Sequence, residues 1–167
     1  MKTLYIMVGA PASGKSYFAK NKLMNGPGWA YVSRDEIRFS IIGEDEDYFA
    51  HEKEVFLEFA RKICTMLNNE SVYNVIAGAT HLNWGSRRKL LTAVEYYMGF
   101  GWKDIQIIPV VAWTGLKTIK KRNAERTGRA CVPEDVLTRM WRNFTDPEGD
   151  PYHYTAVMYV TDEENEV

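Results

Sequence analysis

The feature that most constrains the fold is the segment Gly9-Ala10-Pro11-Ala12-Ser13-Gly14-Lys15-Ser16, which matches the pattern G-x-x-x-x-G-K-[ST] in full. An apolar, β-branched run at Thr3–Val8 precedes it, and a stretch of helical character at Ser16–Leu23 follows it. Glycines let successive backbone N–H groups point into one concavity, and the following helix adds its positive end. The segment therefore predicts a phosphate-binding loop (P-loop) between the first strand and the first helix.

This loop predicts a nucleotide ligand, ATP, together with Mg²⁺. In such a loop the lysine, here Lys15, reaches the β- and γ-phosphates, and the hydroxyl of Ser16 holds the metal ion. A glycine-rich turn without a ligand is the alternative, but the strand before the loop and the helix after it favour binding. The residues of this loop that are predicted to bind ATP are Gly9, Ala10, Pro11, Ala12, Ser13, Gly14, Lys15 and Ser16, and Arg122 and Arg126 are predicted to join them.

Strand-like and helical segments alternate along the rest of the chain, which predicts a parallel sheet with helices on both faces. Further strands are expected at Trp29–Ser33, Val72–Gly78, Ile105–Ala112 and Thr155–Val160. Helices are expected at Asp47–Leu67, Arg87–Met98, Leu116–Arg126 and Val136–Phe144. The predicted architecture is a single α/β domain over residues 1–167. It is a three-layer, adenylate-kinase-like P-loop fold with a five-stranded sheet, a helical lid at about 127–144 and an acidic tail at 161–167.

Composition limits the class of protein but does not indicate a function. The chain has 167 residues, of which 46% are hydrophobic, so it is long enough for one well-packed domain. We find no apolar run near the ~18 residues that a membrane span needs, and Cys64 and Cys131 form no C-x-x-C pair. We therefore expect a cytoplasmic protein. The formal net charge is -1, yet basic residues cluster between Trp84 and Arg129; a polyanion-facing surface and ordinary solvated helices both remain open.

Asp35 is the acidic residue that follows a predicted strand at the ligand-binding edge of the sheet. The carboxyl ends of parallel strands form the ligand crevice, so Asp35 is a candidate general base for an attacking hydroxyl. Arg38 shares a helical face with Asp35 and could clamp an anionic group of the acceptor; a surface ion pair worth ~0.2–0.5 kcal/mol is the alternative. The other strand ends carry Ala79 and Trp113, and no N-K-x-D motif is present, which disfavours a regulatory GTPase.

Arginines near the predicted lid are candidates for charge stabilisation. Arg122 and Arg126 are four residues apart, so both are expected on one face of the basic helix, with Arg129 as an alternative. Phosphoryl transfer spreads negative charge over oxygens that a planar guanidinium binds well. The segment that follows, Thr127–Phe144, is expected to close over ATP.

Taken together, the P-loop, Ser33-Arg34-Asp35-x-x-Arg38 and Arg122-x-x-x-Arg126 resemble the kinase domain of bacterial and phage polynucleotide 5′-hydroxyl kinases. The resemblance covers essentially the whole chain in order and includes His81-Leu82-Asn83, Gly101-Trp102-Lys103, Trp113-Thr114 and Val132-Pro133-Glu134-Asp135-Val136-Leu137. It implies ATP-dependent phosphorylation of a DNA or RNA 5′-OH end in nucleic-acid repair, in a bacterial or phage-infected cell. A homo-oligomer is also compatible with it.

The resemblance also implies residue roles. The aspartate matching Asp35 activates the 5′-OH, the arginine matching Arg38 binds the adjacent phosphate, and the one matching Arg126 contacts the transferring phosphate with support from Arg122. Arg34, Thr80 and His81 join the expected acceptor site. Some phage members have Asp-Thr-Asn where this chain has Ala79-Thr80-His81, which removes a carboxylate partner of the catalytic arginine. Because no D-x-D-G-T motif is present, we expect no 3′-phosphatase activity.

Two other functions stay open at the level of sequence. A small-molecule P-loop kinase could use the same loop, base and lid arginines. A nucleotide-binding module with an inactive kinase centre is the other alternative, and Ala79 is the residue that keeps it in consideration.

Overall fold

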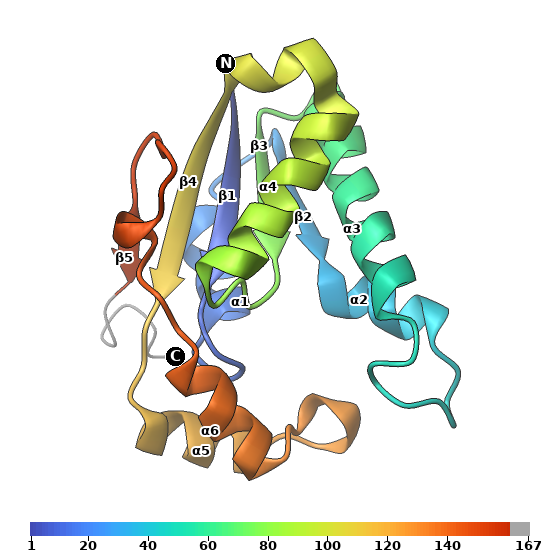
Figure 1. Cartoon of the computed structure of the whole chain (residues 1–167), viewed down its shortest axis with the longest axis vertical. Helices are drawn as coiled ribbons and strands as arrows, with labels where there is room; N and C mark the ends of the chain where they lie inside the picture. The colour runs from blue at the N-terminus through green and yellow to red at the C-terminus, as the bar shows by residue number, and fades with distance from the viewer. Residues whose placement is uncertain (161–167) are drawn as a thin grey trace.

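The fold is built on a five-stranded parallel sheet. The structure, a computed structural model, describes residues 1–160; the acidic tail predicted at 161–167 lies outside this range. The strands follow the order β2-β3-β1-β4-β5 across the sheet (Figure 1). Their bounds are β1 Lys2–Val8, β2 Trp29–Ser33, β3 Asn74–Gly78, β4 Ile105–Ala112 and β5 Met158–Val160. The predicted fold class, a three-layer α/β domain with a parallel five-stranded sheet, is confirmed.

The central strands are apolar on both faces, because helices cover both. In β1, Leu4 pairs in register with Val75 of β3 and Ile107 of β4, and all three side chains are almost completely buried. Alternate residues of such a strand point to opposite layers. Leu4 and Ile6 pack in one core cluster, whereas Met7 packs in another on the other side of the sheet.

Helices form the two outer layers and a cover over the carboxyl ends of the strands. The α-helices are α1 Lys15–Phe18, α2 Arg34–Ile41, α3 Glu52–Leu67, α4 Trp84–Met98, α5 Leu116–Ala124 and α6 Glu134–Arg142. Buried side chains of α3 and α4 share one core cluster with the sheet, and Phe18 of α1 belongs to the cluster on the opposite face. In Figure 1, α5 and α6 lie beyond the arrowhead of β4, at the edge where the P-loop emerges from β1. Within residues 1–160, none of the helices is both long and apolar enough for a membrane crossing.

The start of α3 differs from the predicted start, and this difference affects the candidate site. The helix predicted over Asp47–Leu67 begins only at Glu52, and the chain before it, from Gly43 to His51, forms turns. These turns let Tyr48 reach back to α2, as described below. Elsewhere, the helix predicted at Ser16–Leu23 is a short α-helix followed by a π-helical turn at Ala19–Leu23. Near the end of the described residues, Pro147–Gly149 form a 3₁₀ turn.

Candidate active site

The P-loop is shaped by glycines that no other residue could replace without strain. A Cβ on Gly9 would lie 2.6 Å from the carbonyl oxygen of Ala112 and 2.7 Å from Ser13 Oγ, so only glycine fits between β1 and the end of β4. Gly14 is the N-cap residue of α1 and has φ 91°, a left-handed conformation that favours glycine. The N–H of Gly9 donates to the carbonyl of Thr80 at 2.9 Å, which fixes the start of the loop to the chain just after β3.

The Lys15 ammonium lies against the loop and is influenced by one positive group, Arg126, and one negative group, Asp35. Its Nζ donates to the carbonyl of Ala10 at 2.8 Å. Burial, and to a lesser degree the charge of Arg126, lowers the pKa of Lys15 to about 7, although Asp35 opposes the shift. Asp35 and Arg126 are therefore both near enough to act on the Lys15 charge. The structure thus brings together these three predicted residues from separate elements.

The loop offers polar groups that suit a phosphate with its metal ion. Ser13 Oγ is buried and has no hydrogen-bond partner within residues 1–160, which is the state expected of a group that meets a ligand. Ser16 is exposed, and its hydroxyl lies 3.3 Å from the Tyr31 hydroxyl. Hydroxyl oxygen is a ligand type that Mg²⁺ accepts, together with phosphate oxygens. The residues present therefore fit a Mg²⁺-nucleotide complex.

Asp35 lies in the first turn of α2, directly after β2. Ser33 caps this helix, because its side chain accepts a hydrogen bond from the N–H of Glu36 at 3.2 Å. The Asp35 side chain is 60% exposed, so one side of the carboxylate is free to meet a substrate. Its Oδ1 accepts hydrogen bonds from the Tyr48 hydroxyl and from Arg38, each at 2.5 Å. These contacts hold the carboxylate in place at the carboxyl end of the sheet.

The Arg38 guanidinium is bound by Glu52, Asp35 and Tyr48. Its side chain is only 6% exposed, and its Nε and one terminal nitrogen donate to the same oxygen of Glu52 at 2.9 and 2.7 Å. The other terminal nitrogen contacts Asp35 and Tyr48, and the guanidinium lies 4.1 Å from the centre of the Tyr48 ring. In this arrangement Arg38 orients Asp35. To clamp an acceptor phosphate, as the sequence predicts, Arg38 has to exchange one of these contacts.

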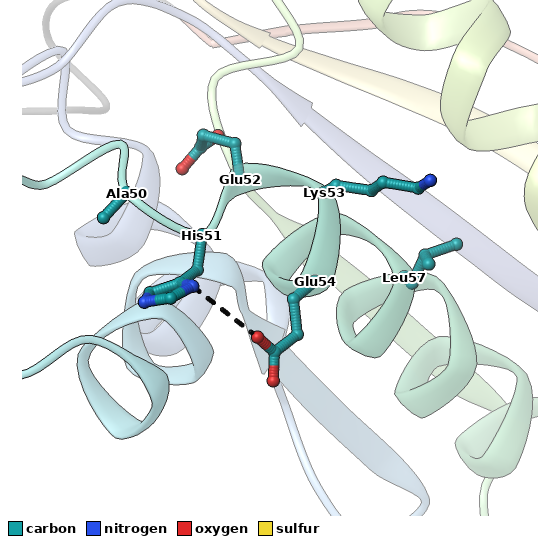
Figure 2. Close-up of a pocket in the computed structure, with 6 residues that line it drawn as sticks. All are labelled: Ala50, His51, Glu52, Lys53, Glu54 and Leu57. Carbon is teal, nitrogen blue, oxygen red and sulfur yellow. Dashed lines mark ion pairs between the residues drawn. The ribbon is translucent and has the colours of Figure 1, made fainter.

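Glu52, the first residue of α3, joins the two arginines of α2. Its second oxygen accepts a hydrogen bond from Arg34 at 3.0 Å, while the first binds Arg38. A surface depression of about 380 Å³ lies beside it, lined by Ala50, His51, Glu52, Lys53, Glu54 and Leu57. Figure 2 shows the Glu52 side chain on the opposite side of the chain from the His51–Glu54 ion pair. None of the lining residues belongs to the P-loop, so this depression is separate from the phosphate site.

His81 lies beneath the site rather than on its surface. It is 4% exposed, its ring stacks against Phe59, and one ring nitrogen bonds to the carbonyl of Met7 at 2.9 Å. Burial lowers its pKa to about 4, although the bond to Met7 opposes this shift. The ring is therefore neutral at physiological pH, with Nδ1–H donating to Met7. The role predicted for Thr80 and His81 in acceptor binding stays a prediction, and both contact the first strand or the P-loop through the bonds described.

The lid arginines lie differently from the predicted helical face. Helix α5 ends at Ala124, so Arg126 follows the helix instead of sharing a face with Arg122. Arg126 is exposed and donates to the carbonyl of Ala130 at 3.4 Å, yet it is near enough to lower the pKa of Lys15. Arg129 reaches further, and donates to the carbonyl of Gly43 at 2.9 Å. The segment after α5 therefore extends from the P-loop to the end of α2.

A family assignment follows from comparison with known proteins. The profile of a family described as an AAA domain, AAA_33, matches residues 4–147. The chain belongs to this AAA domain family. The match includes the P-loop, α2 and the arginines after α5.

Solved structures share the fold of this AAA domain at low sequence identity. A fungal RNA kinase gives a TM-score of 0.66 at 12% identity, over 96% of this chain and 74% of that chain. A chain of the Pnkp1/Rnl/Hen1 RNA repair complex gives a TM-score of 0.66 at 23% identity, and the match covers 85% of this chain and 43% of that chain. A sugar kinase from Janibacter sp. HTCC2649 gives a TM-score of 0.62 at 14% identity, and the match covers 99% of this chain and 90% of that chain. The likeness shows a P-loop kinase-like fold, and the AAA domain spans less than half of the matched chain in the repair complex.

Two residues of the site, Tyr48 and Glu52, are not indicated by any sequence pattern. Apolar spacing predicts both of them in one helix, where neither has a spacing relationship to Asp35 or Arg38. Their contacts with α2 depend on how the chain turns before α3, which no local pattern records. A hint lies in the sequence itself: two arginines that face a ligand site need acidic partners, and Glu52 is an acidic residue at the start of the next helix.

Nucleotide binding by this AAA domain is expected to take up a proton at pH 8. With a pKa of about 7, Lys15 of the free domain is mostly neutral at that pH, whereas phosphate contact favours its charged form. Calorimetry of Mg²⁺-ADP binding in Tris and in HEPES should give enthalpies that differ by the buffers' ionisation heats. The control is Lys15→Arg, whose guanidinium is already charged and should bind without proton uptake. Equal enthalpies in both buffers for the wild-type domain would contradict this prediction.

Proposed function

We propose that this AAA domain is an ATP-dependent polynucleotide 5′-hydroxyl kinase. The observation that carries the proposal is the position of Asp35, an exposed carboxylate after β2 that lies close enough to Lys15 to influence its charge. A base beside the lysine that binds the γ-phosphate suits transfer to a hydroxyl group. A P-loop protein that only binds nucleotide has no need of such a carboxylate.

The proposed reaction uses residues from each part of the site. The acceptor hydroxyl oxygen attacks the γ-phosphorus, its proton passes to Asp35, and the bond from that phosphorus to the β–γ bridging oxygen breaks to release ADP. Lys15 binds the β- and γ-phosphate oxygens, and Arg126, supported by Arg122, neutralises charge on the transferring group. Ser16 would hold Mg²⁺, which supplies further neutralisation of the phosphates when bound.

Support for a polynucleotide acceptor comes from several directions. The ordered sequence resemblance points to 5′-OH ends, and the structural neighbours include a protein described as an RNA kinase and one from an RNA repair complex. Arg34 precedes Asp35 on α2 and Arg38 binds the Asp35 carboxylate, so either arginine could meet the first phosphate after a terminal nucleoside. A sugar kinase of the same fold keeps a small-molecule acceptor as the alternative.

The deciding experiment measures label transfer from γ-labelled ATP with Mg²⁺ to 5′-OH oligonucleotides of DNA and of RNA. We expect transfer to at least one of them, none to the same oligonucleotide with a 5′-phosphate, and none from Lys15→Ala. A parallel panel of sugars and other small alcohols tests the alternative acceptor. Transfer to a small alcohol alone would replace the proposal with a small-molecule kinase, and nucleotide binding without any transfer would indicate an inactive centre.

A further inference from the structure

Exposed aromatic rings lie beside Asp35 and have no role in the core. Phe39 is 41% exposed and Phe49 is 57% exposed, and neither belongs to a buried core cluster of residues 1–160. Both pack edge-on against Tyr48, with ring centres 6.1 Å apart for Phe39 and 4.8 Å apart for Phe49. A single exposed phenylalanine is ordinary on a protein surface, but a group of rings around one tyrosine needs an explanation.

Phe39 lies one helical turn from the proposed base. Asp35 and Phe39 are four residues apart on α2, so they share a face of the helix with Cβ atoms about 5–6 Å apart. Tyr48 joins them, because its hydroxyl binds Asp35 while its ring meets the edge of Phe39. An acceptor with its hydroxyl at Asp35 would therefore have the next part of its structure beside the Phe39 ring.

A positively charged side chain, that of Arg129, lies beside the Phe39 ring. The Arg129 guanidinium lies 5.8 Å from the centre of the Phe39 ring, and Arg129 is anchored to the carbonyl of Gly43 just after α2. The exposed Phe39 ring thus has a carboxylate one helical turn away and a guanidinium beside it. The ligand that matches all three has a hydroxyl, a flat aromatic base and a negatively charged phosphate, which together describe the terminal nucleotide of a polynucleotide.

We propose that Phe39 is the surface on which the base of the acceptor's terminal nucleotide stacks. This inference rests on the proposed kinase function and deepens it by assigning the base a binding site. Stacking accepts any base, since every base has a π-face, so Phe39 would favour nucleotides over sugars without selecting a sequence. Loss of a stacking ring should weaken acceptor binding by about 5- to 150-fold.

The test compares two acceptors with two forms of the protein. One acceptor is a 5′-OH oligonucleotide, and the other is the same oligonucleotide with an abasic 5′-terminal residue that keeps the hydroxyl and the phosphate. In the wild-type domain, loss of the base should raise the acceptor KM at least fivefold. Phe39→Leu should raise the KM of the normal acceptor by a similar factor, leave that of the abasic acceptor unchanged and leave kcat within about twofold, since Asp35 is retained.

Two further variants serve as controls. Phe39→Trp keeps a ring and should restore discrimination between the acceptors. Tyr96→Leu removes a ring that is 82% exposed on α4, and it should leave both KM values unchanged. Thermal unfolding of Phe39→Leu should match that of the wild-type domain, because the ring is at the surface.

The stacking role would be overturned if Phe39→Leu leaves both KM values unchanged. It would also be overturned if the variant raises both KM values equally, because an equal rise would indicate an effect on the lid or on Asp35. Failure of the proposed function looks different: the wild-type domain would then label no 5′-OH polynucleotide, and both proposals would fall together. Normal labelling of both acceptors with equal KM values in the wild-type domain would overturn only the stacking role.

Discussion

Replacing Asp35 with asparagine is expected to slow phosphoryl transfer by about 10²–10⁴-fold, the usual contribution of a general base. Asparagine keeps an oxygen that can accept the Tyr48 hydrogen bond but cannot take the proton of the acceptor hydroxyl. Glu52 remains to neutralise Arg38, so the fold should survive. Steady-state labelling of a saturating acceptor measures the rate, and calorimetry with Mg²⁺-ADP should show nucleotide binding retained.

The matched control is Glu36→Gln. Glu36 is the next residue, is also exposed and lies in the same first turn of α2, so this variant makes an equal change of charge beside the site. We expect its transfer rate to stay within a few-fold of the wild-type rate. If Asp35→Asn were as fast as Glu36→Gln, Asp35 would not be the base.

Asp150→Ala is expected to destabilise the domain by about 3–5 kcal/mol, because it leaves a buried cation without its counter-ion. Asp150 binds Arg87 through two hydrogen bonds, at 2.7 and 2.8 Å, and the two side chains are 2% and 0% exposed. Arg87 also donates to the carbonyls of His81 and Thr145, so it ties α4 to the loop after β3 and to the chain after α6. Chemical denaturation with matched m-values would measure the loss.

Glu148→Ala provides the comparison for that measurement. Glu148 is exposed and lies two residues before Asp150, so its removal should change the free energy of unfolding by no more than about 0.5 kcal/mol. Similar small losses in both variants would show that the buried ion pair adds little to stability. Arg87 belongs to the basic segment between Trp84 and Arg129, yet it lies in the core and so is not part of a polyanion-facing surface.

Element positions could be predicted from local patterns where a pattern was strong. β2 and β4 have the predicted bounds, because turn residues precede β2 and the run of β4 is apolar and β-branched. The predicted start of α3 is five residues too early, because apolar spacing continues through Phe49 although that ring is exposed. The predicted helix at Leu116–Arg126 is too long, because α5 ends at Ala124, before Arg126.

The sequence by itself determined the P-loop and its place after the first strand, because phosphate binding there depends on backbone geometry that glycines encode locally. It also placed Asp35 at the ligand edge of a parallel sheet. Only the tertiary structure decided what holds Asp35 and Arg38. Tyr48 and Glu52 reach them across turns and from another helix, and Asp150 reaches Arg87 over 63 residues of chain. Such pairings depend on how whole elements pack, and no periodic pattern in the chain specifies them.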